Sequence, residues 1–214
     1  MNIDAPVQIP LFKRLFDVIF SIFFLILLAP FLMVAYILSV IEKIFDGAAR
    51  GPWLYCEKRI SAGKPFDFYK IRTCHLSAYE QCRREFGSIH TAFVENDKNF
   101  TRVGRILKRV YLDEAPQLFN VLIGDMSLVG PRPKPPVEYE ECLRAGNLTK
   151  KYLTAGLTGI FQSYKGHWPA GIGDKEMDGE YYELCRTGSG LKIVWNDCKI
   201  IARTIKVILE HKGI

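Results

Sequence analysis

The feature that most constrains this chain is an uncharged run of 24 residues, Val18–Ile41, near its N-terminus. At about 1.5 Å per residue, a helix of this length crosses a hydrocarbon core of about 30 Å, so the run predicts a membrane segment. The run is longer than the core of about 7–15 apolar residues in a signal peptide, and no small-residue cleavage site precedes the next charges. We therefore expect a membrane-bound protein.

Pro30 divides this run and leaves two courses open for the chain. A proline inside a helix removes one backbone hydrogen bond and bends the helix axis. Basic residues flank both ends of the run, such as Arg14 before it and Lys43 after it, and such residues favour the cytoplasmic side of a membrane. A re-entrant helix that breaks at Pro30 would put both ends on that side. From these features alone, a kinked helix that spans the membrane is the favoured alternative.

The composition suits a chain that meets anionic partners. A formal net charge of +6 fits a membrane surface, a phosphorylated substrate or nucleic acid. The six cysteines form no CxxC pair and, with four scattered histidines, show no zinc spacing, so we expect reduced cytoplasmic thiols. We interpret His167 as a loop residue rather than a ligand. The length of 214 residues suits a membrane segment, residues 1–48, followed by one domain, residues 49–214.

Two adjacent carboxylates, Asp113 and Glu114, form the first candidate for chemistry. Asp113 is a suitable N-cap residue, Pro116 is tolerated in a first turn, and the apolar residues that follow predict a short helix. The positive end of a helix stabilises a carboxylate anion, and its free N–H groups bind phosphate, so a nucleophile and a phosphate site can occupy one place. The alternative is an ordinary capped helix, which the abundance of surface carboxylates favours for an isolated pair.

Basic residues surround this pair in the sequence. Residues 51–72 read as a small β-hairpin, and residues 101–110 predict a helix with a cationic stripe, for which a solvated basic face is the alternative. Residues 130–133, Gly-Pro-Arg-Pro, form a rigid turn that fixes an arginine, whose guanidinium can bind phosphate through two hydrogen bonds. The candidate phosphate-binding residues are Arg59, Lys70, Arg72, Lys108, Arg109 and Arg132.

Residues 191–210 predict a final helix with basic side chains along one stripe and apolar side chains largely opposite. A basic amphipathic helix that carries an aromatic residue, here Trp195, suits a membrane interface. Packing of the same helix against the domain is an equally serious alternative.

The segments that carry these features also carry the signature of a known family. The run TRVGRILKR…LDEAPQLFNVLIGDMSLVGPRP, preceded by GPWLY…FYKIR and followed by GLTGIFQ, resembles the bacterial sugar transferase family. Its small members are monotopic polyprenol-phosphate phosphoglycosyltransferases. The resemblance extends from Lys13 to about Gly213, and its signature is highly specific. It favours a functional Asp–Glu pair over an ordinary capped helix.

The resemblance implies transfer of a sugar-1-phosphate from a UDP-sugar to polyprenol (undecaprenyl) phosphate, which yields polyprenol-diphosphate-sugar and UMP. Asp113 would be the nucleophile that carries a covalent phosphosugar, and Glu114 would deprotonate or position the acceptor phosphate. Lys70 and Arg132 would bind phosphate, and Mg²⁺, with Asp113 as its ligand, would assist. The reaction would be the first membrane step of a bacterial exopolysaccharide, O-antigen or glycoprotein pathway.

The resemblance also implies a fold and a location. The expected fold class is α+β and mostly helical, with a re-entrant helix broken at Pro30, amphipathic interfacial helices and a small β-hairpin around a cytoplasmic active site. The catalytic domain would lie on the cytoplasmic face of the bacterial inner membrane. The implied partners are the bilayer, a second copy of the chain and downstream glycosyltransferases, with no nucleic acid.

The chain departs from the family pattern at several positions. Ala29 precedes Pro30 where serine is usual, and Lys108 replaces an arginine, which keeps the charge but loses the bidentate fork. Glu57–Lys58–Arg59 replaces the usual Gln-Glu-Arg, and Thr154–Ala155–Gly156 replaces Arg-Pro-Gly. The loss of arginine at position 154 removes a phosphate or nucleotide contact, unless Lys150 or Lys151 provides that contact instead. Because the Asp–Glu pair and the Gly-Pro-Arg-Pro turn are intact, we expect activity.

Three other classes of protein remain as alternatives. A catalytically weakened relative that serves as a membrane-bound scaffold would bind ligands without turnover, and Thr154 is the feature that supports it. A membrane-tethered nucleic-acid-binding protein would show a steep salt dependence of its affinity, but no recognition motif supports it. A fully spanning lipid phosphotransferase would normally need more membrane segments. No motif identifies the sugar.

Overall fold

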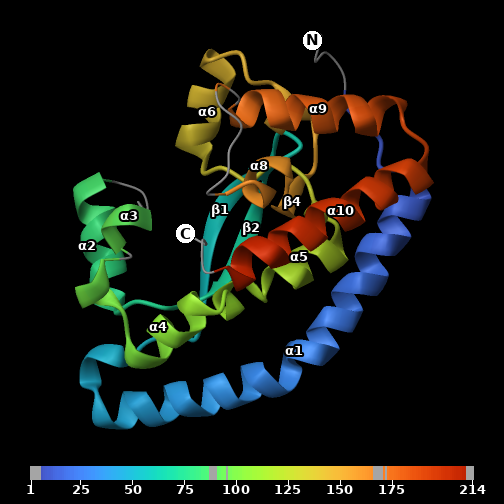
Figure 1. Ribbon diagram of the computed structural model, residues 1–214. Coiled ribbons are helices and arrows are strands. Elements are labelled where there is room, and N and C mark those ends of the chain that lie inside the picture. Colours follow the sequence, from blue (N-terminus) through green and yellow to red (C-terminus); the bar gives the residue numbers. More distant parts are fainter. Residues whose placement is uncertain (1–5, 87–90, 95, 166–170, 172, 211–214) are drawn as a thin grey trace. The chain divides into compact units, whose positions relative to one another are not determined.

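The computed structural model describes residues 6–86, 91–94, 96–165, 171 and 173–210 (Figure 1). His167, interpreted above as a loop residue, lies outside the described residues. The chain divides into two compact units. Unit 1 comprises Met1–Phe24, Glu57–Phe68 and Gln117–Ile214, and unit 2 comprises Leu25–Cys56 and Tyr69–Pro116.

Helices make up most of the described chain (Figure 1). The longer helices are α1 (Leu11–Phe45), α2 (Leu76–Phe86), α4 (Arg102–Arg109), α6 (Pro136–Arg144), α9 (Asp174–Thr187) and α10 (Gly190–Leu209). The shorter helices are α3 (Thr91–Val94), α5 (Gln117–Ile123), α7 (Thr149–Tyr152) and α8 (Ile160–Ser163), with 3-10 turns at Gly47–Ala49, Asp97–Asn99 and Leu112–Glu114. The strands β1 (Leu54–Ser61) and β2 (Lys64–Ile71) form one sheet, and β3 (Met126–Val129) and β4 (Ala155–Thr158) form another. The predicted helical fold with a small hairpin is therefore confirmed.

In the described ranges, α1 is the one helix long and apolar enough to cross a membrane. A signal sequence or the core helix of a soluble protein can have the same length and composition, but only 11% of the most apolar window of α1 is buried. Its apolar side chains are largely exposed, such as Ile26 at 71% and Phe31 at 61%. The surface of α1 therefore suits an apolar surrounding such as lipid.

Helix α1 continues through Pro30 without interruption. A proline removes one hydrogen bond, and a helix can bend at that point and go on because the bonds on either side remain. The predicted break at Ala29–Pro30 is therefore not confirmed. The re-entrant course and the boundary at residue 48 stay predictions.

The parallel pair β3–β4 was not predicted, and it brings two of the sequence motifs together within unit 1. Ser127 lies opposite Gly156 in the register of the two strands. A Cβ atom at Gly156 would lie 2.1 Å from the backbone nitrogen of Gly130, so only glycine allows this approach. The contact fixes the start of the Gly-Pro-Arg-Pro turn against the segment that begins at Thr154.

A buried network of charges joins α1, β3 and α10 within unit 1. The Nζ atom of Lys13 lies 2.6 Å from Asp17 Oδ1 and 2.7 Å from Asp197 Oδ2. Asp17 also accepts a hydrogen bond from the Ser127 hydroxyl at 2.8 Å. None of these four residues is more than 3% exposed. One ammonium therefore faces two carboxylates away from water, where an uncompensated charge costs several kcal/mol.

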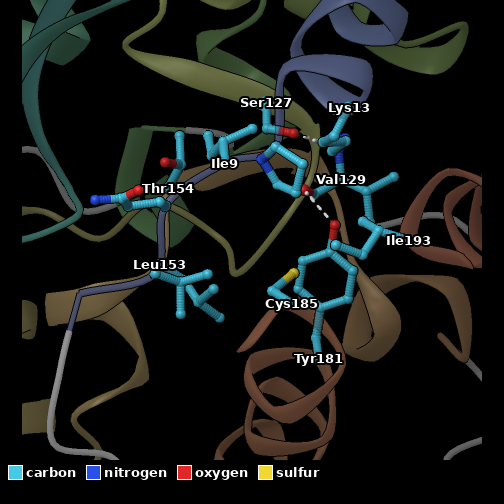
Figure 2. A pocket seen from close by; sticks show the side chains of 12 residues that line it. Ile9, Lys13, Ser127, Val129, Leu153, Thr154, Tyr181, Cys185 and Ile193 are labelled. Atoms are coloured by element: carbon cyan, nitrogen blue, oxygen red, sulfur yellow. Dashed lines mark hydrogen bonds between the residues drawn. The ribbon is translucent and has the colours of Figure 1, made fainter. Parts of the chain in front are cut away.

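Tyr181 of α9 extends this network, and Figure 2 shows it beside Val129 and Cys185. The Tyr181 hydroxyl lies 2.8 Å from Asp197 Oδ1 and 3.2 Å from the carbonyl oxygen of Val129. Burial raises the pKa of Tyr181 well above its ordinary value, so the hydroxyl keeps its proton as a donor. Cys185 lines an adjacent cavity of about 20 Å³, and burial, reinforced by Asp197, raises the pKa of its thiol to about 12.

We expect Lys13→Met to lower the free energy of unfolding by about 3–5 kcal/mol, because it leaves Asp17 and Asp197 buried without their common cation. Urea unfolding in detergent, followed by tryptophan fluorescence, measures the change. Lys192→Met on the exposed side of α10 is the control and should alter the free energy by less than about 0.5 kcal/mol. A Lys13→Met protein as stable as its parent would contradict the role of the network.

Candidate active site

Helix α4 has a firmly held start within unit 2. Thr101 caps it, since its hydroxyl accepts a hydrogen bond from the Gly104 N–H at 2.9 Å. The carboxylate of Glu42, near the end of α1, accepts from the N–H of Arg102 at 2.5 Å and from that of Val103 at 3.1 Å. These side chains satisfy three N–H groups that a helix start leaves open, and the helix dipole favours the anion there. The position of α4 therefore depends on a residue of the apolar helix.

The backbone reverses after α4 at Tyr111, which has a left-handed conformation with φ 59° and ψ 17°. This conformation is rare for a bulky residue and costs about 1–3 kcal/mol, and such residues gather at functional sites. Leu112–Glu114 then form a 3-10 turn in which the Ala115 N–H donates to the Leu112 carbonyl at 3.2 Å. The strained reversal thus leads directly into the acidic pair.

The prediction that Asp113 caps a helix is wrong. Asp113 lies inside the 3-10 turn, and α5 begins only at Gln117. Pro116 has no N–H, so the α-helical bond to the Leu112 carbonyl cannot form and the turn at Leu112–Glu114 closes with 3-10 bonds instead. The acidic pair therefore precedes α5 in the chain without forming its first turn.

Two lysines face the two carboxylates of this turn within unit 2. Lys108 Nζ lies 3.8 Å from Asp113 Oδ2, and Lys70 Nζ lies 3.3 Å from Glu114 Oε1. Asp113 is 1% exposed, whereas the side chain of Glu114 is 21% exposed. The structure therefore brings four of the predicted site residues into one cluster of two cations and two anions.

Arg72, another candidate phosphate ligand, is fully engaged by backbone. Its guanidinium donates to the carbonyl oxygens of Pro52 at 2.8 Å, Cys74 at 2.6 Å and Ala49 at 2.7 Å. Burial lowers the pKa of Arg72 from its ordinary value. These contacts give Arg72 a structural role, and its predicted phosphate contact stays untested. Arg109, at the end of α4, is exposed.

The other two arginine candidates belong to unit 1. Arg59 pairs with Glu57, and its guanidinium lies 5.4 Å from the centre of the Phe68 ring. Arg132 is exposed in the turn after β3. Their phosphate contacts also stay predictions.

Lys150 and Lys151 are the two lysines that could replace the contact missing at Thr154, and Lys150 already pairs with two aspartates. Lys150 Nζ lies 2.8 Å from Asp178 and 3.2 Å from Asp174, and the residue is 4% exposed. Burial opposes the charge of Lys150, but the two carboxylates outweigh it and raise its pKa. Lys151 is exposed. Only Lys151 is therefore accessible to an anionic ligand.

Sequence reasoning missed Glu42 and Tyr111 as residues that shape the site. Glu42 directly follows the uncharged run Val18–Ile41 in the sequence, and its carboxylate caps a helix 60 residues later in the chain. No local pattern announces such a contact. The left-handed backbone at Tyr111 also has no sequence signal, because glycine or asparagine is the usual residue there.

The oxygen atoms of the acidic pair suit a hard cation. In the described part of the chain, no group of three or more His, Cys, Asp or Glu side chains could hold a metal ion. Mg²⁺, however, commonly takes one or two protein carboxylates and completes its shell with substrate phosphates and water. The Asp113–Glu114 pair fits that requirement.

Comparisons with known proteins agree with the motifs in this cluster. A sequence model of the family described as bacterial sugar transferase matches residues 9–211. The undecaprenyl-phosphate galactose phosphotransferase of Salmonella typhimurium is 34% identical over 213 residues, which cover 94% of this chain and 41% of that protein. The UDP-glucose:undecaprenyl-phosphate glucose-1-phosphate transferase of Caulobacter vibrioides is 33% identical, over 95% of this chain and 72% of that protein. The protein of the same name from Klebsiella pneumoniae is 34% identical, over 91% of this chain and 39% of that protein.

The chain spans about two fifths of the length of the Salmonella and Klebsiella relatives. The relatives also differ among themselves in the sugar that their names give, galactose in one and glucose in the others. Overall similarity therefore does not identify a sugar.

We expect Arg72→Lys to lower the free energy of unfolding by about 1–3 kcal/mol, because an ammonium cannot reach three carbonyls arranged around a guanidinium and leaves buried acceptors unsatisfied. Arg109→Lys, at an exposed position, is the matched control and should change it by less than about 0.5 kcal/mol. Urea unfolding in detergent compares the two. Equal stability of the two variants would show that the Arg72 contacts are dispensable.

Proposed function

The chain belongs to the bacterial sugar transferase family, and we propose that it moves a sugar-1-phosphate from a UDP-sugar to undecaprenyl phosphate. The products are undecaprenyl-diphosphate-sugar and UMP. The observation that carries this proposal is the cluster in unit 2, where Lys108 and Lys70 face the Asp113–Glu114 pair. The names of the similar proteins support the same class of reaction.

In the first step, a carboxylate oxygen of Asp113 attacks the β-phosphorus of the UDP-sugar. A bond forms between this oxygen and phosphorus, and the bond from phosphorus to the bridging oxygen of UMP breaks, so UMP leaves with the electron pair. An aspartyl-phosphosugar remains on the protein. Splitting the transfer into two displacements is the advantage of a covalent nucleophile. Burial of Asp113 limits competition from water for the same phosphorus.

In the second step, a phosphate oxygen of undecaprenyl phosphate attacks the same phosphorus and releases Asp113 as a carboxylate. Glu114 is the more exposed of the two acids and is suited to take a proton from the acceptor phosphate or to position it. Lys70 Nζ, 3.3 Å from Glu114 Oε1, orients this carboxylate. Lys108 offsets the repulsion between the Asp113 carboxylate and the diphosphate.

Mg²⁺, held by Asp113 together with substrate phosphates, would neutralise charge on the diphosphate. We further propose that Arg59, Arg109 and Arg132 contact substrate phosphates. Downstream glycosyltransferases would consume the lipid-linked product, and a second copy of the chain is a further proposed partner.

The lipid acceptor requires a membrane location. We propose that α1 is re-entrant at Pro30 and that the catalytic residues lie on the cytoplasmic face of the bacterial inner membrane. The exposed apolar surface of α1 supports membrane insertion. A re-entrant course would let a soluble nucleotide-sugar and a lipid phosphate meet on one side.

The direct test is UMP release by the full chain in nanodiscs with Mg²⁺, undecaprenyl phosphate and a panel of UDP-sugars. We expect release that depends on the lipid acceptor, falls by about 10³-fold or more in Asp113→Asn, and falls by about 10²-fold or more in Glu114→Gln. Asp97→Asn, an exposed carboxylate of unit 2, is the control and should leave the rate unchanged.

A covalent adduct separates the mechanism from simple binding. With UDP-sugar alone, the parent chain should gain the mass of one phosphosugar, and Asp113→Asn should not. Full activity in Asp113→Asn would remove the proposed nucleophile. Folded protein that binds UDP-sugars but releases no UMP would instead support the scaffold alternative, and Thr154→Arg would then test whether the missing arginine explains the silence.

The re-entrant course predicts that an N-terminal and a C-terminal epitope tag both stay protected when spheroplasts are treated with protease. Both tags should be digested once the inner membrane is opened. Digestion of one tag alone in intact spheroplasts would show a spanning helix and contradict the re-entrant course.

A further inference from the structure

Helix α10 presents two different surfaces within unit 1. One face is packed into the unit, with Ile193, Asp197 and Ile200 all 0% exposed. The opposite face carries exposed apolar and small side chains every three or four residues, which we call the apolar stripe: Leu191, Trp195, Cys198, Ala202, Ile205 and Leu209. Trp195 at 66% and Leu209 at 71% are among its most exposed members. The described residues of unit 1 leave this stripe uncovered.

A row of cations runs along one side of the apolar stripe. Lys192, Lys199 and Lys206 are exposed at intervals of seven residues, or about two helical turns. Arg203 lies one turn after Lys199 on the same side. An apolar stripe beside a cationic row is the arrangement of a helix that lies in the plane of an anionic membrane surface. This agrees with the interfacial interpretation of the final helix.

An open cavity of about 630 Å³ lies where α10 meets α8 and α9. Its lining residues are Ile160 and Tyr164 from α8 and its C-cap, Glu180 from α9, and Asn196, Lys199, Ala202 and Arg203 from α10. Ala202 belongs to the apolar stripe and Lys199 to the cationic row, so the cavity opens at the border between them. Its volume falls within the range of small-ligand sites.

The two cations of this cavity have aromatic neighbours. The Arg203 guanidinium lies 4.5 Å from the centre of the Tyr164 ring, and Lys199 Nζ lies 5.3 Å from that of Trp195. Among the residues the structure describes, neither forms a salt bridge, and the buried Nε atom of Arg203 has no hydrogen-bond partner. Among the described lining residues, Glu180 is the one carboxylate. The lining therefore offers two positioned cations against one exposed anion.

We infer that this cavity binds the headgroup of an anionic phospholipid. Arg203 and Lys199 would donate to the phosphodiester, and the Asn196 amide could donate to the headgroup hydroxyls. The acyl chains would continue along the apolar stripe past Trp195, which explains why a cationic cavity opens beside an uncovered apolar surface. A soluble phosphate compound would fill the cavity but leave that stripe in water, so the lipid fits the surface better. The inference concerns unit 1 alone and does not depend on the proposed transfer reaction.

The test uses the full chain in a neutral detergent and native mass spectrometry, with phosphatidylglycerol or phosphatidylcholine of identical acyl chains as the added lipid. We expect phosphatidylglycerol to bind the parent more tightly, and Arg203→Gln or Lys199→Gln to weaken its binding by about tenfold or more, as for loss of a charged hydrogen bond. Lys192→Gln removes the same charge from the same row outside the cavity, and should weaken binding by less than about threefold.

Several results would overturn the inference. Equal losses in Lys192→Gln and Lys199→Gln would show diffuse attraction along the cationic row instead of a site. Equal binding of the two lipids by the parent would remove the role of the anionic headgroup. UMP serves as a soluble phosphate compound for comparison, and its binding should be the same in the parent and in Arg203→Gln. If Arg203→Gln loses UMP binding but keeps phosphatidylglycerol binding, the cavity binds a soluble ligand instead of a lipid. Lys199 is exposed, so Lys199→Gln tests the site even if Arg203→Gln lowers the stability of the protein. The UMP-release assay tests the proposed transfer reaction independently of lipid binding.

Discussion

A lysine held between two buried aspartates organises unit 1. Lys13 comes from the start of the apolar helix, Asp17 from one turn later, and Asp197 from the last helix, so the contact joins segments at opposite ends of the sequence. Each charge would be costly if left alone away from water, which makes the three groups mutually dependent. Ser127 and Tyr181 take up further carboxylate oxygens and extend the network to β3 and α9. The packing of unit 1 is thereby specified by polar groups as well as by apolar surface.

The candidate site in unit 2 depends on groups outside the signature motif. Glu42 holds the start of α4, and α4 carries Lys108 to the acidic turn. Arg72, two residues after Lys70, ties the carbonyls of Ala49, Pro52 and Cys74 together. Tyr111 then stores backbone strain two residues before Asp113. The motif supplies the reactive groups, whereas these supports hold them in place, which is a common division in active sites.

The departures from the family pattern acquire a physical meaning in this setting. A lysine at position 108 offers a compact charge 3.8 Å from Asp113 rather than a bidentate fork, so it serves neutralisation better than orientation. Lys150 cannot stand in for an arginine at Thr154 because two aspartates already hold it. The proposed reaction and the proposed lipid site at the α10 cavity would have one requirement in common, which is phosphate chemistry next to an apolar surface. That requirement accounts for the joint presence of cations and exposed apolar helices.

Features that depend on local residue patterns could be predicted from the sequence. The uncharged run predicted the long apolar helix, residue pattern predicted the β1–β2 hairpin, and helical spacing predicted α4 and α10. The signature motif identified the family and the acidic pair. Which cations face that pair could be seen only in the folded chain. Lys70 and Arg72 lie two residues apart on one predicted segment, yet Lys70 contacts Glu114 whereas Arg72 binds backbone carbonyls. The tertiary structure also replaced the predicted cap at Asp113 by a 3-10 turn, paired β3 with β4, and buried Lys13 and Lys150. These outcomes depend on partners distant in sequence and on how completely each side chain leaves water, and no local pattern records either quantity.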